Sequence, residues 1–186
     1  MASQAALAEY QKKIAVFVDK ATDTHVEPPK EKHVRSIIVE SCEGGSNPNC
    51  VIAFYTAFYR RLSSCDPVIC LKALVVYHRV LHEGCPLFLS RKIINSNFFA
   101  RYMAMWTGAS WSKTHGRLCL AYAELLNSKL AFHLANPAFA GDLSAEKFDE
   151  AQPFKTLEPA RAMTMLSALF AQLKAHMSVA GMVIEF

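Results

Sequence analysis

The sequence has 186 residues, enough for one domain with its own hydrophobic core. Hydrophobic residues make up 52% of the chain and charged residues 19%, a composition that excludes an intrinsically disordered protein. The formal net charge of +4 is too small to indicate nucleic-acid binding, so any anion site has to come from local clustering. The longest apolar run, residues 67–81, is interrupted by Lys72 and Arg79 and is too short to span a bilayer. Without a signal-peptide pattern or a CxxC pair, the chain is expected to be cytoplasmic, with reduced cysteines that fill the core.

Apolar spacings of three and four predict helices throughout the first third of the chain. The first is expected over about residues 3–22 and the second over about 30–42, after a double proline at 28–29 that suits a helix start. The composition of residues 43–49 indicates a loop. A third helix, rich in aromatic residues, is expected over about 50–62.

The fourth helix is predicted over about residues 67–81, with Asp66 as its N-cap and Gly84 after its end. It is apolar on nearly every side, which indicates a central, buried element. A short helical piece near 86–90 and a further helix around 93–107 are expected to follow.

Two long helices are predicted in the last part of the chain, over about residues 111–133 and 157–183, separated by a loop over 135–154. Methionines in the last helix favour burial in a core, and the alternative is an apolar face left open. No segment shows strand alternation, so the prediction is an all-α stack of about seven to nine antiparallel helices, either a bundle or a superhelical α-solenoid.

Few residues are arranged as a catalytic or metal site would require. His78 and His82 have the i, i+4 spacing of helical zinc pairs, but the glutamate of HExxH and an obvious third ligand are missing. No glycine-rich phosphate loop, GxSxG motif or carboxylate pair is apparent. We therefore expect no enzyme activity, no metal and no cofactor.

One stretch, KATDTHVEPPKEKHVR at residues 20–35, concentrates charge between two predicted helices. Lys30, Lys32 and His33 fall in the first turn or two of the second helix, where free backbone N–H groups and the helix dipole favour anions. Lys20 lies across the connection, at the end of the first helix. The stretch is a candidate anion site.

Helix geometry limits how these side chains could converge. Residues 30 and 32 point about 160° apart on a regular helix, so they reach one anion only if Lys30 precedes the regular turns or if the anion lies across the helix end. The alternative is a solvated surface in which Glu27 and Glu31 pair with the lysines, and such pairs contribute little stability.

The same stretch resembles the lipid-binding signature of ANTH domains. In that signature a Lys-Ala-Thr/Ile group and six variable residues precede Pro/Ala/Ser-Lys-x-Lys-His/Tyr; here residues 20–22 match the first group and residues 29–33 the second. Segments 28–41, 71–86 and 131–144 are similar to the branch of clathrin–actin linkers that contains huntingtin-interacting protein and its yeast relatives. ANTH domains of this branch are longer, so residues 1–186 are expected to be an N-terminal portion of one.

The resemblance implies an ENTH/VHS-like α-solenoid that binds phosphatidylinositol 4,5-bisphosphate in the cytosolic leaflet, peripheral on the plasma membrane and on clathrin-coated pits or vesicles. Clathrin, ENTH-domain adaptors and, through regions outside this chain, actin are the implied partners; nucleic acid is not expected. Headgroup contacts would fall on Lys20, Lys30, Lys32 and His33. The possible accessory basic residues are Lys12, Lys13 and Arg35. The alternative function is a helical protein-interaction module that binds a peptide or a partner adaptor in a groove between helices, with lipid binding secondary.

Overall fold

The computed structural model describes residues 4–44, 47–85, 98–136 and 157–184. These parts of the chain contain seven helices and no strand, as the all-α prediction requires. The helices are α1 (Gln4–Ala21), α2 (Glu31–Gly44), α3 (Pro48–Leu62), α4 (Pro67–Glu83), α5 (Ala100–Met105), α6 (Thr114–Ala135) and α8 (Pro159–Ile184).

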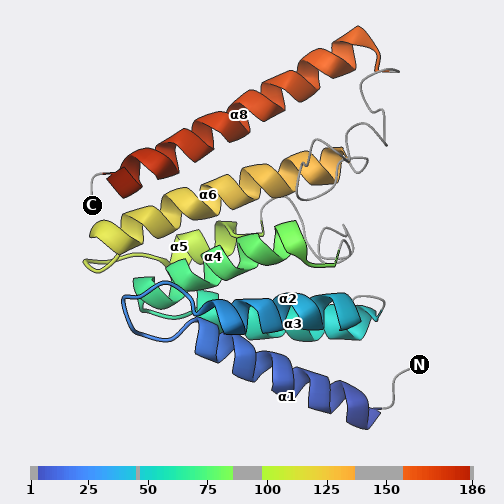
Figure 1. Ribbon diagram of the computed structural model, residues 1–186. Helices are drawn as coiled ribbons and strands as arrows, with labels where there is room; N and C mark the ends of the chain where they lie inside the picture. The colour runs from blue at the N-terminus through green and yellow to red at the C-terminus, as the bar shows by residue number, and fades with distance from the viewer. Residues whose placement is uncertain (1–3, 45–46, 86–97, 137–156, 185–186) are drawn as a thin grey trace.

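The helices stack in layers along one direction, from α1 at one end to α8 at the other (Figure 1). Helices α1, α2 and α3 pack together, α4 joins them to α6, and α6 carries α8 on its outer side. The α1–α2 and α6–α8 pairs are antiparallel (Figure 1). This order is that of an α-solenoid, in which each layer is covered mainly by its neighbours.

Local sequence explains several helix ends. The Asp66 side chain accepts a hydrogen bond from the Val68 N–H at 2.8 Å, so the predicted N-cap of α4 is confirmed. Asn47 caps α3 in the same way, which starts that helix at Pro48, two residues before its predicted start. Gly84 follows α4 as predicted; a Cβ there would lie 2.6 Å from the Val80 carbonyl oxygen, so the close approach requires glycine.

The core centres on aromatic side chains of α3 and α4. Phe54, Phe58 and Tyr77 are fully buried, and the rings of Phe58 and Tyr77 meet edge to face with centroids 5.9 Å apart. The hydroxyl oxygens of Tyr55 and Tyr77 lie 3.2 Å apart, so their polar ends satisfy each other inside the core. Helix α4 is thus the buried, central element that its apolar sequence predicted.

The boundaries around residues 100–114 differ from the prediction. Helix α6 begins at Thr114, because Trp111 packs from the preceding loop, where its ring stacks on that of Trp106 at 5.0 Å. Helix α5 is confined to Ala100–Met105 within the segment predicted as 93–107; the beginning of that segment and the predicted piece at 86–90 lie outside the described residues. Most of the loop predicted over 135–154 lies outside them too.

The cysteines are only partly core residues. All six are free, as expected, and Cys50, Cys70 and Cys119 are buried. Cys42 and Cys65, however, are exposed, so the prediction that the cysteines serve as core fillers is wrong for these two.

Candidate anion-binding site

The candidate site is formed where α1 ends and α2 begins. Lys20 lies in the last turn of α1, and Lys32 and His33 lie in the first turn of α2. Lys30 directly precedes α2, and its carbonyl oxygen accepts hydrogen bonds from the N–H groups of His33 at 2.9 Å and Val34 at 3.3 Å. Lys30 is therefore the N-cap residue, outside the regular turns, which satisfies one of the two conditions under which it and Lys32 could converge.

The four predicted residues share one electrostatic environment. The pKa of His33 is lowered by its partial burial and then by the positive charges of Lys32, Lys20 and Lys30. That three lysines from both helices act on one imidazole indicates that the fold brings the two halves of the motif together. All three lysines are exposed and His33 is half-buried.

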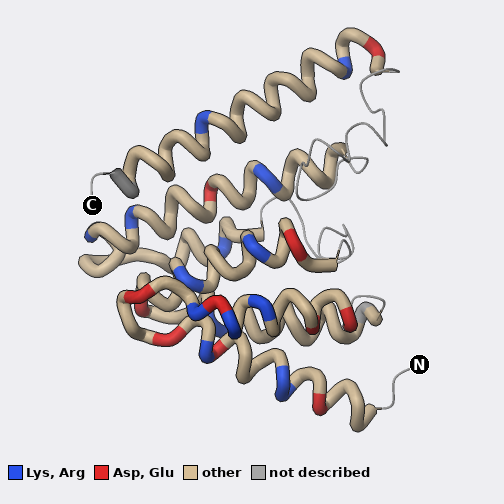
Figure 2. Tube along the Cα trace, viewed as in Figure 1, with Lys and Arg blue, Asp and Glu red and all other residues tan. Residues whose placement is uncertain are grey.

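Two acids of this stretch, Asp23 and Glu31, are engaged by cations from α4. Glu31 accepts hydrogen bonds from Arg35 at 3.1 Å and from Arg79 of α4 at 3.2 Å, rather than from the lysines. Asp19 pairs with Arg60 of α3. Figure 2 shows the charged residues gathered around this end of the stack.

As a result, the positive charge of the lysines remains available. Within the described parts of the chain, Lys20, Lys30 and Lys32 form no ion pair. The first turn of α2 adds N–H groups that lack intrahelical acceptors, together with the positive end of the helix dipole. The arrangement can bind a multiply charged anion from two sides, with the lysines as point charges and His33 as a further donor.

The accessory cations differ in availability. Lys13 is paired with Glu40, whose side chain is 9% exposed, and Arg35 is paired with Glu31. Lys12 is exposed, on the same helix as Lys20. Of the three, Lys12 is the one without an ion pair among the described residues.

A lysine from α4 holds the loop between the two half-sites in place, and sequence reasoning missed this role. Lys72 is 6% exposed, and its ammonium pairs with the Asp23 carboxylate. It also donates hydrogen bonds to the carbonyl oxygens of His25 at 2.8 Å and Asp23 at 3.3 Å. The signal available in the sequence is a lysine within an otherwise apolar run.

The Lys-Ala-Thr group is anchored from α3. Thr22 is fully buried; its hydroxyl donates to the Val18 carbonyl oxygen at 2.7 Å, and Arg61 donates to the same hydroxyl at 2.6 Å. A second Arg61 nitrogen donates to the Thr22 carbonyl oxygen. Lys20 thus projects from a turn whose backbone is tied to the core.

The His78–His82 pair serves packing. The Nε2 atoms of the two rings lie 3.1 Å apart, and His78 Nδ1 lies 2.8 Å from the Tyr122 hydroxyl of α6. Burial, and then the nearby His82, lowers the pKa of His78 to about 3. In the described parts of the chain, no group of three or more His, Cys, Asp or Glu side chains could hold a metal ion.

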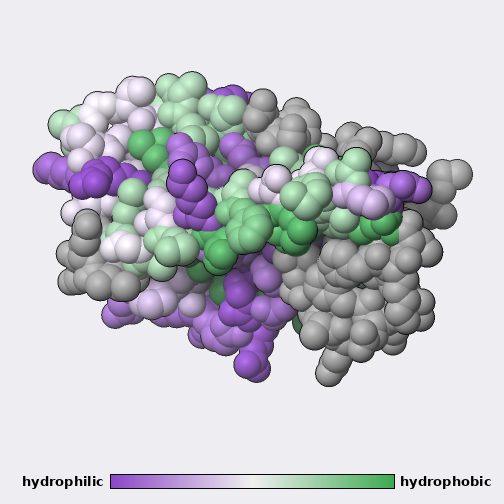
Figure 3. Space-filling view, turned by 90° about the horizontal axis from the view of Figure 1, so that it is seen from above, coloured by the Kyte–Doolittle hydropathy of each residue, from purple (hydrophilic) through white to green (hydrophobic). Residues whose placement is uncertain are grey.

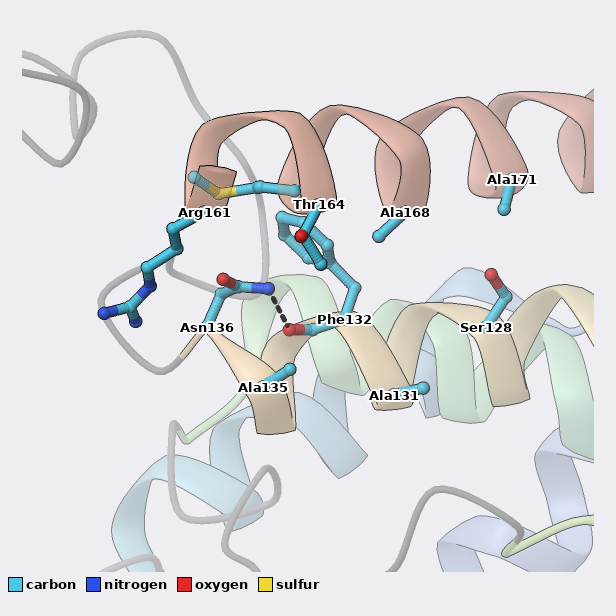
Figure 4. A pocket seen from close by; sticks show the side chains of 10 residues that line it. Ser128, Ala131, Phe132, Ala135, Asn136, Arg161, Thr164, Ala168 and Ala171 are labelled. Atoms are coloured by element: carbon cyan, nitrogen blue, oxygen red, sulfur yellow. Dashed lines mark hydrogen bonds between the residues drawn. The ribbon is translucent and has the colours of Figure 1, made fainter. Parts of the chain in front are cut away.

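An apolar hollow of about 340 Å³ lies between α6 and α8, away from the candidate anion site. Figure 4 shows small side chains such as Ala131, Ala135 and Ala168 along it, with Arg161 and Asn136 at one end. Such a lining offers shape rather than charge, so it suits an apolar side chain better than an anion.

Comparison with known proteins gives the type of fold first and then the family. The chain superimposes over its whole length on 68% of a solved structure entitled the ENTH domain from epsin-2 in complex with phosphatidylinositol 4,5-bisphosphate, with a TM-score of 0.79 and 23% identity. This likeness establishes an ENTH-type helical fold. The model of the ANTH domain family then matches residues 13–183, so the chain belongs to the ANTH domain family.

Curated relatives place the chain in the same branch that the sequence resembled. It is 31% identical over 144 residues to human huntingtin-interacting protein 1, covering 76% of this chain and 13% of that protein. It is 30% identical over 131 residues to the endocytosis protein end4 of Schizosaccharomyces pombe, covering 70% of this chain and 12% of that protein. The chain therefore spans about an eighth of the length of these relatives. Separately, none of the described helices is long and apolar enough to cross a membrane.

Proposed function

We propose that this chain binds the headgroup of phosphatidylinositol 4,5-bisphosphate through Lys20, Lys30, Lys32 and His33. One observation carries the proposal: three exposed lysines, which form no ion pair within the described parts of the chain, surround a half-buried histidine at the start of α2, while Asp19 and Glu31 are paired with arginines of α3 and α4. Each lysine near an anionic surface contributes about 1 kcal/mol, so three give useful but reversible binding.

The family supports the biological setting. ANTH-family relatives are named as endocytosis and clathrin assembly proteins, and the ENTH-fold neighbour was solved with this lipid. We propose that residues 1–186 are part of one ANTH unit that recruits an endocytic adaptor to the cytosolic face of the plasma membrane. The unit acts by binding rather than by catalysis, alongside clathrin-coat proteins, with actin engaged through other regions of the protein.

Vesicle co-sedimentation tests the site. The double variant Lys30→Glu plus Lys32→Glu should lose most binding to vesicles that contain phosphatidylinositol 4,5-bisphosphate, and binding by the parent chain should weaken with salt. The matched control, Lys113→Glu plus Arg117→Glu, makes the same charge change on exposed residues at the start of α6. Equal losses in both variants would show attraction by bulk charge and reject the site; unchanged binding in the first would reject it as well.

The hollow between α6 and α8 favours a second candidate function, docking of a peptide side chain from a partner adaptor. Filling the hollow with Ala168→Phe should abolish a pull-down of such a partner that persists without lipid. If Ala168→Phe leaves that pull-down intact, the partner docks elsewhere.

A further inference from the structure

Charged side chains are unevenly distributed over the described surface. Seen from the α8 side (Figure 3), hydrophobic side chains form a band and hydrophilic ones lie in separate groups. Beside the candidate anion site, by contrast, four charged side chains of α2 and α4 are linked into one chain of ion pairs: Arg35, Glu31, Arg79 and Glu83. With two positive and two negative charges, this charge network is neutral as a whole.

Arg79 is the central member of the charge network. Its Nη1 and Nη2 atoms donate to the two carboxylate oxygens of Glu31, each at 3.2 Å. The Nε atom of Arg35 donates to the same carboxylate at 3.1 Å. On its other side, the Arg79 guanidinium donates to Glu83, one turn further along α4. A planar guanidinium with five N–H donors can hold two carboxylates in fixed positions, which a lysine ammonium cannot do. Glu31 is thereby held toward α4.

The place of Glu31 in the chain makes this contact important for an anion. Glu31 is the first residue of α2, directly between Lys30 and Lys32. A carboxylate released there would repel a phosphate, and it would compete with the phosphate for the neighbouring ammonium groups and for the free N–H groups of the first helical turn. Because the Glu31 side chain is 49% exposed, its ion pairs rather than burial fix its position.

We propose that Arg79 is a positioning residue of the anion site, which holds Glu31 against α4 and compensates its charge. The inference rests on the proposed headgroup function, and Arg79 acts through Glu31 rather than by contact with the headgroup. Hydrogen bonds from Arg79 and then from Arg35 lower the pKa of Glu31. Glu31 is therefore ionised at neutral pH, so its charge has to be compensated by a cation rather than by protonation.

Titration calorimetry with inositol 1,4,5-trisphosphate tests the inference without a membrane. Arg79→Gln leaves the charge network with a net charge of −1 beside the lysines, so headgroup binding should weaken roughly threefold to tenfold. The matched control, Arg117→Gln, makes the same charge change on an exposed residue of α6 and should bind within about twofold of the parent. Because the pairs of the network are solvent-exposed, Arg79→Gln should remain folded, which circular dichroism checks.

Rescue separates the positioning role from a general loss of charge or structure. Glu31→Gln added to Arg79→Gln should restore the parent affinity to within about twofold, because the carboxylate that Arg79 compensates is then absent. Glu83→Gln added to Arg79→Gln gives the same net charge but should restore less. Glu83 lies beside the last turn of α2, where its carbonyl oxygen is 4.0 Å from the Cys42 Sγ, at the other end of the helix from the site. The defect of Arg79→Gln should also shrink at about 0.5 M salt, as expected for a screened charge.

Each outcome decides between the inference and its alternatives. If the parent binds and Arg79→Gln binds like Arg117→Gln, the inference is overturned and the proposed function stands. A rescue by Glu83→Gln as complete as that by Glu31→Gln also overturns it, because net charge alone then explains the defect. No rescue by Glu31→Gln overturns it as well, since Arg79 then acts by another route. A parent chain that does not bind the headgroup, or whose lysine double variant binds it equally well, rejects the proposed function and this inference with it.

Discussion

Lys72→Met should destabilise the chain and weaken headgroup binding, although Lys72 lies in the protein interior. The substitution keeps the apolar stem of the side chain and removes the ammonium that holds the α1–α2 loop. Three hydrogen bonds are lost, to the Asp23 carboxylate and to the carbonyl oxygens of Asp23 and His25. Because the Asp23 side chain is 31% exposed, water recovers part of its solvation. The net cost should therefore be about 2–3 kcal/mol, below that of a fully buried broken pair.

The same substitution should lower the affinity for inositol 1,4,5-trisphosphate roughly threefold to tenfold, because a released loop no longer holds Lys20 and Lys30 at a fixed separation. Urea denaturation gives the stability and titration calorimetry the affinity. Lys113→Met, on an exposed lysine, should change the unfolding free energy by less than about 0.5 kcal/mol.

A double-mutant cycle isolates the ion pair. Asp23→Asn added to Lys72→Met should cost much less than the sum of the two single changes, because each single change leaves one charge of the pair without its partner and the double variant removes both charges. The reasoning fails if Lys72→Met is as stable as the Lys113→Met control. It also fails if a folded Lys72→Met variant binds the headgroup like the parent.

The two remaining predictions concern pH. Burial and the three lysines lower the pKa of His33, and the negative charge of a bound phosphate should raise it. Protonation of His33 and headgroup binding should therefore favour each other, so the headgroup affinity should increase as the pH falls from about 8 to about 5.5. Calorimetry should find a flatter pH dependence for His33→Gln, and equal pH profiles would remove His33 from the site. The pKa of His78 is about 3 when folded and about 6.5 when unfolded. Between pH 6.5 and pH 3 the unfolded chain therefore binds more protons than the folded chain, and the free energy of unfolding decreases as the pH is lowered. This histidine alone should lower the unfolding free energy by about 2 kcal/mol between pH 7.5 and pH 5. Urea denaturation should show a smaller decrease for His78→Gln, and an unchanged decrease would contradict the assigned pKa.

The first four helices and the N-cap of α4 could be predicted because their signals are local, whereas Asn47, the N-cap of α3, lies in the predicted loop. The first four helices follow apolar periodicity, and Asp66 followed by Pro67 marks the start of α4 in the sequence itself. Trp111 shows where this approach fails. As an apolar residue before a helical pattern it was assigned to the helix, yet it is buried by stacking on Trp106 from a loop.

The residues of the candidate site stay a prediction from the signature, and their electrostatic state could not be predicted from the sequence. The signature identifies the lysines by spacing alone. Whether those lysines are neutralised depends on partners 41 to 49 residues away in the chain, such as Arg60 for Asp19 and Lys72 for Asp23. Glu31 was considered as a partner for the neighbouring lysines, whereas Arg79 of α4 binds it. Periodicity carries no information on contacts at such separations.

These long-range pairs give the Lys-Ala-Thr group two roles. Lys20 is exposed to solvent, whereas Ala21 and Thr22 are buried and Thr22 is held by Arg61. A larger residue in place of Ala21 or a residue without a hydroxyl in place of Thr22 would act on the position of Lys20, not on its charge. In the proposed site, the second and third positions of the group therefore set the position of Lys20, and we expect the affinity to depend on the core of α3 and α4 as much as on the lysines themselves.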